Sequence, residues 1–342
     1  MYHETRFYSG LQEVLDKIEY GLDPLPLVVE FYPTNLCNLA CSFCFGAVRV
    51  NGNGANESLL MLKDYYRIFG ELEEIGIDHI SFSGGGEPFA YRGFISLLEK
   101  AISVGFTTRL VTNGTLINRK HWATLLQLRE LRFSVNAFLP ETYAKLKSTS
   151  VRNFSRVIDN VIGLTQMNLD GKRNTEIGVT FTLSESNFAE TLPFVEFMID
   201  DIGVNTVLIK TDIYEQNERF KDACKELAKK IEKYTAGISP VQKVHFRWPN
   251  DDYRSKSLPC FVPHFKVAID PYGNLFSCCL GAQPGNQGGY FFGNLKRGTF
   301  KQVWEESEII RRRLQERGAE CRVCNYTDNK INKNIIQLAL IE

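Results

Sequence analysis

Three closely spaced cysteines are the residues of this chain best suited to metal chemistry. Cys37, Cys41 and Cys44 lie in CNLACSFC with the spacing Cys-x3-Cys-x2-Cys. A structural zinc ion or a closed iron–sulfur cluster usually takes four protein ligands, whereas a site that binds a further molecule keeps a position open. The spacing therefore predicts a cluster with one iron left free. A zinc site with a distant fourth ligand is the alternative.

A second group of cysteines lies near the C-terminus. The chain has nine cysteines, three clustered near the N-terminus and five near the C-terminus, with Cys224 apart from both groups. Such spacings fit metal ligation in a reducing compartment better than disulfides. The five histidines are scattered, so a histidine-rich metal site is not expected. The cysteine pattern predicts two metal sites.

A glycine run follows a predicted strand at His79–Gly84. The sequence SGGGEP occupies Ser83–Pro88, some forty residues past the first cysteines. Alone, a glycine run usually marks a tight turn. At the carboxyl end of a strand, it also exposes backbone groups, and Glu87 offers a carboxylate that can accept from an ammonium group. A surface charge is the alternative for Glu87.

These two motifs together resemble the radical S-adenosylmethionine (SAM) superfamily from about Leu27 to the C-terminus. In that family the open iron is chelated by the amino and carboxylate groups of SAM. One electron from the reduced cluster then cleaves SAM to methionine and a 5′-deoxyadenosyl radical. The resemblance implies that Phe43 packs beside the adenine and that Gly85, Gly86 and Glu87 bind SAM.

Polar residues after later strands are further candidates for SAM binding. The resemblance places Ser134 and Asn136 near the ribose and methionine, although Asn136 replaces the more usual Asp. Thr112 and Asn113 lie at the end of the third predicted strand. Ordinary loop capping explains these residues equally well. No arginine is assigned as an anchor for the SAM carboxylate.

The C-terminal cysteines resemble the SPASM auxiliary-cluster motif. Cys260, Gly273 and Cys278 form Cys-x12-Gly-x4-Cys, and a Cys-x2-Cys pair ends at Cys324. No cysteine follows Cys324, so the resemblance is to the shorter twitch version, which implies one 4Fe–4S cluster. A zinc ribbon is the alternative. The implied ligands are Cys260, Cys278, Cys321 and Cys324.

Two cysteines remain outside these sets. Cys279 is a candidate hydrogen-atom donor, a spare ligand or a buried structural residue, and the last role is the commonest for an unpaired cysteine. Cys224 lies on a charged predicted helix, and we expect a structural role for it.

Strand-like and helix-like segments alternate behind these motifs. Six strands, each followed by a helix, require parallel pairing with right-handed crossovers. This matches the family's partial (β/α)6 TIM-like barrel, an α/β fold whose active site lies at the carboxyl ends of the strands. The six predicted strands are Leu27–Tyr32, His79–Gly84, Thr107–Gly114, Leu131–Ala137, Glu176–Leu183 and Thr206–Thr211.

The pattern changes to short strands and turns from about Val241, which predicts a small C-terminal twitch-like auxiliary-cluster domain. We therefore expect an N-terminal extension over 1–26, the radical SAM partial barrel over 27–236 and the auxiliary domain over 237–342.

Composition excludes several classes of function. Lys plus Arg and Asp plus Glu both number 40, so bulk nucleic-acid or anionic-membrane binding is not expected. No apolar run approaches the roughly 20 residues of a membrane helix. The first ten residues lack the basic and apolar regions of a signal peptide. We expect a cytoplasmic protein.

The resemblance implies an enzyme with two 4Fe–4S clusters and SAM as cofactors. The favoured substrate is a ribosomally made precursor peptide, modified by crosslinking, epimerisation or backbone excision. A separate peptide-recognition protein is expected because no leader-binding domain precedes residue 27, and a flavodoxin or ferredoxin is the expected reductant. The alternative is an aminocyclitol-like small-molecule dehydrogenase or epimerase. Candidate substrate contacts are Tyr32, Lys210, Asp212, Tyr214, Arg247 and Trp248.

A cluster- or zinc-bearing structural or regulatory protein is the non-enzymatic alternative. It predicts neither SAM binding nor 5′-deoxyadenosine.

Overall fold

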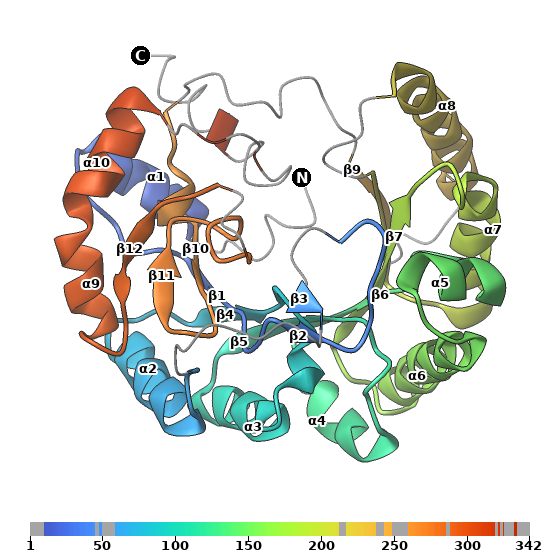
Figure 1. The fold of residues 1–342 in the computed structure, drawn as a ribbon, viewed down its shortest axis with the longest axis horizontal. Helices are drawn as coiled ribbons and strands as arrows, with labels where there is room; N and C mark the ends of the chain where they lie inside the picture. Colours follow the sequence, from blue (N-terminus) through green and yellow to red (C-terminus); the bar gives the residue numbers. More distant parts are fainter. Residues whose placement is uncertain are drawn as a thin grey trace. The chain divides into compact units, whose positions relative to one another are not determined.

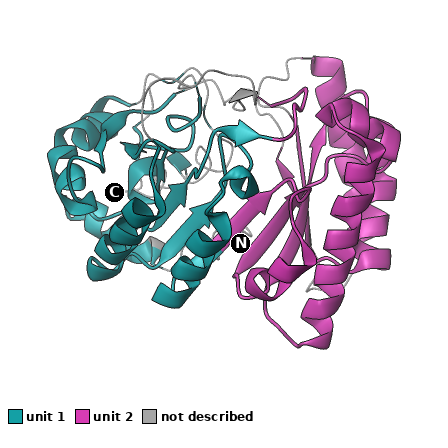
Figure 2. Ribbon diagram, turned by 60° about the horizontal axis from the view of Figure 1, so that its bottom comes forward, with its two compact units in different colours: residues 1–37, 46–108, 251–342 teal, residues 38–45, 109–250 magenta. Residues whose placement is uncertain are grey.

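The computed structural model describes residues 10–44, 48–49, 59–211, 217–236, 243–247, 259–284, 288–318, 321, 324 and 332–333. The chain divides into two compact units (Figure 2). Unit 1 comprises residues 1–37, 46–108 and 251–342, and unit 2 comprises residues 38–45 and 109–250. Unit 1 thus joins segments from both ends of the sequence.

Unit 1 contains a mixed sheet in the order β12-β11-β10-β1-β4 (Figure 1). β1 lies between two parallel neighbours, β4 and β10, whereas β10, β11 and β12 pair in antiparallel fashion. A separate short parallel pair, β2 (Leu36–Cys37) with β3 (Val48–Arg49), carries the first cysteine. The main strands are β1 (Val28–Phe31), β4 (His79–Phe82), β10 (Lys266–Ile269), β11 (Asn274–Phe276) and β12 (Phe291–Asn294).

The helices of unit 1 form because apolar residues recur at helical spacing. In α2 the buried residues are Tyr65, Ile68, Phe69 and Leu72, which share one face. Phe69 meets Phe31 of β1 edge to face at 5.4 Å between ring centroids, which fixes α2 on the sheet. The helices are α1 (Leu11–Glu19), α2 (Leu62–Glu74), α3 (Phe94–Val104), α9 (Phe300–Glu306) and α10 (Glu308–Arg317).

Unit 2 is a parallel α/β array in the order β5-β6-β7-β8-β9. Seven of the eight residues of β7 are buried, as expected for a parallel strand covered on both faces. The strands are β5 (Thr107–Thr112), β6 (Glu130–Ser134), β7 (Glu176–Leu183), β8 (Thr206–Thr211) and β9 (Lys243–Arg247). The α-helices are α4 (Trp122–Leu125), α5 (Pro140–Lys147), α6 (Val151–Asp170), α7 (Thr191–Glu196) and α8 (Glu218–Thr235).

The expected mostly parallel α/β architecture is confirmed, with one difference in strand assignment. The segment of β9, which the sequence pattern placed in the C-terminal domain, pairs in parallel with β8. The amphipathic helix α8 connects the two strands and buries Phe220, Leu227 and Ile231, so β9 completes another strand–helix–strand unit. The division of domains near residue 237 stays a prediction.

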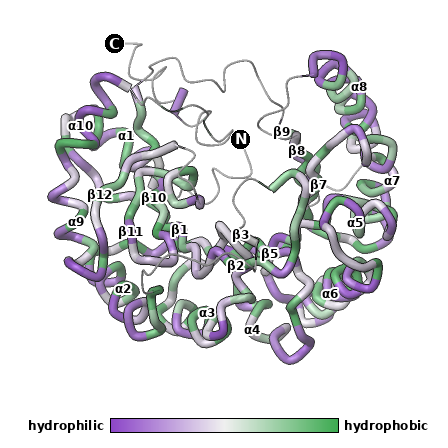
Figure 3. Tube along the Cα trace, in the orientation of Figure 1, coloured by the Kyte–Doolittle hydropathy of each residue, from purple (hydrophilic) through white to green (hydrophobic). Residues whose placement is uncertain are grey.

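Hydrophilic and hydrophobic residues alternate along the helices of both units (Figure 3). In the part of the chain that the structure describes, no helix is both long and apolar enough to cross a membrane.

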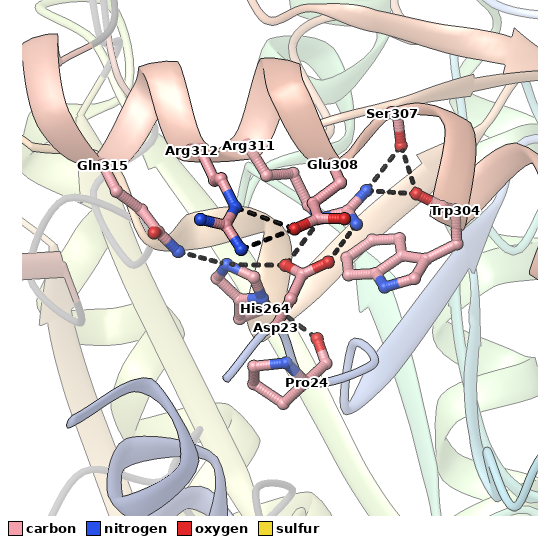
Figure 4. A network of polar contacts seen from close by, with 9 residues as sticks. All are labelled: Asp23, Pro24, His264, Trp304, Ser307, Glu308, Arg311, Arg312 and Gln315. Carbon is pink, nitrogen blue, oxygen red and sulfur yellow. Dashed lines mark hydrogen bonds and ion pairs between the residues drawn. The ribbon is translucent and has the colours of Figure 1, made fainter. Parts of the chain in front are cut away.

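A buried polar network ties α10 to the segment before β1 (Figure 4). Arg311 is 1% exposed, pairs with Asp23 and lies 3.7 Å from the ring centroid of Trp304. His264, also buried, contacts the carbonyl oxygen of Pro24 through Nδ1 at 3.0 Å. A charged group inside a protein needs such partners because desolvation is costly. The network therefore fixes the position of α10.

Candidate functional site

The glycine-rich loop after β4 is hydrogen-bonded to the segment that leads into Cys37. The Gly86 N–H donates to the Thr34 carbonyl at 3.0 Å, and the Glu87 N–H donates to the Leu36 carbonyl at 2.8 Å. A Cβ atom at Gly86 would lie 2.1 Å from the Leu36 oxygen, so no side chain fits there. The loop consequently keeps a backbone surface that a ligand can approach closely.

Two buried acceptors beside this loop suit a ligand with a donor group. The Oδ1 atom of Asn35 is buried with no hydrogen-bond partner among the described residues, and a Cβ atom at Gly85 would lie 2.3 Å from it. Glu87 is 3% exposed, and its Oε1 accepts from the Phe89 N–H at 3.2 Å, capping the short turn Pro88–Ala90. The two oxygens are suitable acceptors for an ammonium group. The assignment of Gly85, Gly86 and Glu87 to SAM stays a prediction.

The three N-terminal cysteines fall in both units. Cys37 is on β2 of unit 1, whereas Cys41 and Cys44 belong to unit 2. Within unit 2, the Ala40 N–H donates to the Lys147 carbonyl at 3.2 Å, and the Cys44 N–H donates to the Cys41 carbonyl at 3.1 Å. These bonds attach the cysteine loop to the end of α5. Phe43 is half-buried and Cys44 is exposed.

Lys147 is a residue that the sequence analysis did not select. It is 1% exposed, and its ammonium donates to the Ser134 carbonyl and lies 5.1 Å from the Tyr143 ring centroid. Burial raises the pKa of the Cys41 thiol, and the nearby positive charge of Lys147 opposes that rise. A signal did exist, because Tyr143, Leu146 and Lys147 share one buried helix face. A lysine at an apolar position of a helix indicates a buried charge with a specific partner.

The asparagines after β5 and β6 mainly hold loops together. Asn113 donates to Asn38 Oδ1 at 3.0 Å, which secures the residue next to Cys37. Asn136 has φ 69° and accepts from the Thr182 N–H at 2.9 Å. The Thr112 hydroxyl accepts from the Gly114 N–H at 3.0 Å.

Capping therefore accounts for the contacts seen at these positions, and their role in SAM binding stays a prediction. Ser134 is half-buried, and its backbone carbonyl accepts a hydrogen bond from the Lys147 ammonium.

Polar residues occupy the carboxyl ends of β7, β8 and β9. The register places Thr182 opposite Lys210, and Lys210 opposite Arg247. Side chains at matched positions of parallel neighbours share a face of the sheet. Lys210 and Arg247 are therefore neighbouring cationic residues on one face of the sheet. Each of them also has other interactions in the structure. Asp212, Tyr214 and Trp248 lie outside the described residues.

The C-terminal cysteines lie in unit 1. Leu314 of α10 accepts from the Cys260 N–H at 2.9 Å, so the helix held by Arg311 also supports this cysteine. A Cβ atom at Gly289, where φ is 94°, would lie 2.9 Å from Cys278 Sγ. Burial raises the pKa of the Cys321 thiol, and a hydrogen bond from the Gly289 backbone opposes the rise. Gly289 therefore brings backbone close to two expected ligands.

The described part of the chain holds no group of three or more His, Cys, Asp or Glu side chains placed to bind a metal ion. The assignment of the cysteines to clusters therefore rests on their thiol chemistry and spacing, and on the close backbone approach at Gly86 and Gly289. Cys324 is half-buried. Cys279 is 6% exposed, and its carbonyl accepts from the Tyr32 hydroxyl at 3.2 Å. Cys224 is 1% exposed on α8, as expected for a structural residue.

Comparison with known proteins places both cysteine groups in recognised domains. Residues 31–195 match the profile of the radical SAM superfamily, and residues 260–325 match the SPASM iron–sulfur cluster-binding domain. The chain is 34% identical to the PqqA peptide cyclase of Rhodopseudomonas palustris over 101 residues, which are 30% of this chain and 26% of that protein. This alignment thus spans about a quarter of the relative's length.

Two further relatives extend over most of the chain. Mycofactocin maturase MftC of Mycobacterium tuberculosis is 24% identical over 336 residues, covering 94% of this chain and 81% of that protein. The crystal structure of Streptococcus suis SuiB bound to precursor peptide SuiA matches with a TM-score of 0.66 at 17% identity. That match covers 92% of this chain and 74% of the other and shows that the fold is shared.

Proposed function

We propose that this chain, which carries a radical SAM domain and a SPASM iron–sulfur domain, oxidatively modifies a ribosomally made precursor peptide. The observation that carries the proposal is the alignment with the maturase MftC over 94% of this chain. The fold shared with SuiB, whose structure holds a precursor peptide, agrees with it. Crosslinking, epimerisation and backbone excision are the candidate outcomes.

The residues of the chain have distinct tasks in this proposal. When bound, the N-terminal cluster and SAM supply a 5′-deoxyadenosyl radical that removes a hydrogen atom from the substrate. Cys37, Cys41 and Cys44 would hold the cluster, and Lys147 would place a buried positive charge beside its ligand Cys41. Asn35 and Glu87 would accept hydrogen bonds from the SAM ammonium. The second cluster would be held by Cys260, Cys278, Cys321 and Cys324.

Substrate and electrons are proposed to arrive through other proteins. A separate recognition protein would deliver the precursor peptide, and a flavodoxin or ferredoxin would supply the reducing electron. Lys210 and Arg247 would offer positive charge to the substrate at the ends of β8 and β9, where parallel folds place their ligands.

The experiment is anaerobic co-expression of the chain with small peptides encoded beside its gene, in partly deuterated water, followed by intact-mass analysis. A mass change that disappears in Cys41→Ala supports peptide maturation. Loss of two hydrogens indicates a crosslink or oxidation, a larger loss indicates excision, and deuterium uptake alone indicates epimerisation. If no encoded peptide changes while the chain still cleaves SAM, the proposal fails and a small-molecule dehydrogenase or epimerase replaces it.

A further inference from the structure

Three segments of unit 1 meet at the hydroxyl of Tyr32. This hydroxyl donates to the carbonyl of Cys279 at 3.2 Å and accepts from Gln283 Nε2 at 3.2 Å. The same Nε2 group lies 3.4 Å from the carbonyl oxygen of Gly84. Tyr32 follows β1, Gly84 opens the glycine-rich loop, and Cys279 and Gln283 belong to the turn after Cys278. Hydrogen bonds therefore connect the proposed SAM loop with the turn that carries an auxiliary-cluster ligand.

Packing strengthens this connection. A Cβ atom at Gly85 would lie 3.0 Å from Pro284 Cδ, so the turn rests directly on the glycine-rich loop. Tyr32 is 2% exposed. Burial, followed by the charge of Glu30, holds the pKa of its phenol well above the ordinary value. The buried hydroxyl thus makes its hydrogen bonds to Cys279 and Gln283 away from water.

We propose that Tyr32 and Gln283 are positioning residues that couple SAM binding to the auxiliary cluster. The inference rests on the cofactors of the proposed function. A ligand that fixes Gly84 and Gly85 also restrains Gln283 and Pro284, because these residues touch. The restraint reaches Cys278 through the turn of the chain and through the bond from Tyr32. Coupling between two sites is reciprocal, so the redox state of the auxiliary cluster alters SAM affinity by the same factor.

The test is a redox titration of the full chain with both clusters reconstituted, followed by electron paramagnetic resonance with and without SAM. The auxiliary signal is identified in a variant in which Cys37, Cys41 and Cys44 are all Ala. A fivefold coupling, the low end of the usual range, corresponds to a shift of about 40 mV for a one-electron couple. We expect a SAM-dependent shift in the wild type and loss of at least half of it in Tyr32→Phe and in Gln283→Leu.

Tyr65→Phe is the matched control. Tyr65 is 1% exposed in the same unit, and its hydroxyl has no hydrogen-bond partner among the described residues. This variant should retain the full shift. Hydrogen exchange of residues 276–284 gives a second measure, and SAM should slow it in the wild type and less in Tyr32→Phe.

The outcomes separate the coupling from the function. The coupling alone is overturned if the potential of the auxiliary cluster does not shift in wild type saturated with SAM. It is also overturned if both Tyr32→Phe and Gln283→Leu keep the full shift. The coupling and the proposed function are overturned together if the chain does not bind SAM in equilibrium dialysis. The same holds if the reconstituted chain contains only enough iron for one cluster.

Discussion

Lys147 is buried in unit 2 and brings a positive charge into its interior. Lysine side chains are rarely fully buried in proteins unless they are paired. The ammonium of Lys147 is held by the Ser134 carbonyl and by the face of Tyr143. Its backbone carbonyl accepts from Ala40, so one residue both anchors the cysteine loop and places charge near Cys41. A buried cation stabilises a thiolate and the more negative state of a cluster that the thiolate binds.

We predict that Lys147→Met lowers the midpoint potential of the N-terminal cluster. The reduced cluster carries more negative charge and loses a nearby cation. A tenfold change in the reduction equilibrium would give about 60 mV for one electron. Redox titration measures it, and Lys145→Met, on the exposed side of α5, is the control. Equal potentials in Lys147→Met and wild type would show that the charge does not act on the cluster.

His264 should make the stability of unit 1 depend on pH. Burial lowers the pKa of its imidazole, although the Pro24 carbonyl and Asp23 oppose the shift. At this histidine the unfolded chain therefore binds a proton more readily than the folded chain. The contribution of neutral His264 to the free energy of unfolding is fully present above about pH 6.5 and is lost progressively as the pH falls toward the pKa of the folded state. The slope for one such group is at most about 1.4 kcal/mol per pH unit.

Denaturant unfolding between pH 7.5 and about pH 5 measures this slope. His264→Gln should flatten the curve, whereas the partly exposed His121→Gln should leave it unchanged. A curve that His264→Gln does not flatten would contradict the prediction.

Among the elements, the glycine-rich loop is joined to the segment before Cys37 by backbone hydrogen bonds. Gly86 and Glu87 pair with the segment that ends in β2, which leaves no space for a side chain at Gly86. The loop thus positions β2 and Cys37 before any ligand is bound.

We predict that Gly86→Ala destabilises the chain and weakens SAM binding at least tenfold. The added methyl group would meet the Leu36 carbonyl, so the backbone must shift. Gly70→Ala on α2 is the control, because a Cβ atom there meets nothing within 4 Å and should stabilise the helix by about 0.5–1 kcal/mol. Thermal unfolding and equilibrium dialysis provide the measurements, and wild-type SAM affinity in Gly86→Ala would refute the expected role of the loop.

Most elements were predictable because their signals are local. The strands Glu176–Leu183 and Thr206–Thr211 occur at the predicted bounds, and the spacing of the cysteines identified both domains. The segment of β9 was predicted as a short strand but was assigned to the C-terminal domain, because the sequence alone does not show that its partner is β8. For Lys147 the helical spacing with Tyr143 and Leu146 was a local signal of burial, but its contact with the cysteine loop at Ala40 is distant in sequence and had no such signal.

Tyr32 was selected only as a weak substrate contact. Its partner Cys279 lies 247 positions away in sequence, and no local pattern reports such a contact.

The whole molecule combines a region that matches the radical SAM superfamily and a region that matches the SPASM iron–sulfur domain in a single chain. The parallel pairing of β10 with β1 places the strand that leads, through β11, to the turn at Cys278 beside the strand that leads into the first cysteine loop. We therefore expect the two clusters to have separable roles.

Cys321→Ala should spare part of SAM cleavage and stop product formation, because it removes only an auxiliary ligand. Chromatography of 5′-deoxyadenosine and mass analysis of the peptide measure the two activities. Cys224→Ala, a buried cysteine outside both sets, should leave both activities in place. Unchanged product yield in Cys321→Ala would rule out a functional second cluster.

The order of unit 1 in sequence also governs how the chain matures during synthesis. β1 is made early, yet its neighbour β10 emerges much later, and Cys279, whose carbonyl is bonded to Tyr32, lies 247 residues beyond it. At about 5–20 residues per second, this interval lasts roughly 12 to 50 seconds. Until β4 is made both edges of β1 are unpaired, and afterwards the edge that β10 will occupy stays open to wrong partners. Full assembly of the ligand-bearing framework therefore waits for the last third of translation, and nascent chains should engage chaperones until β10 has left the ribosome.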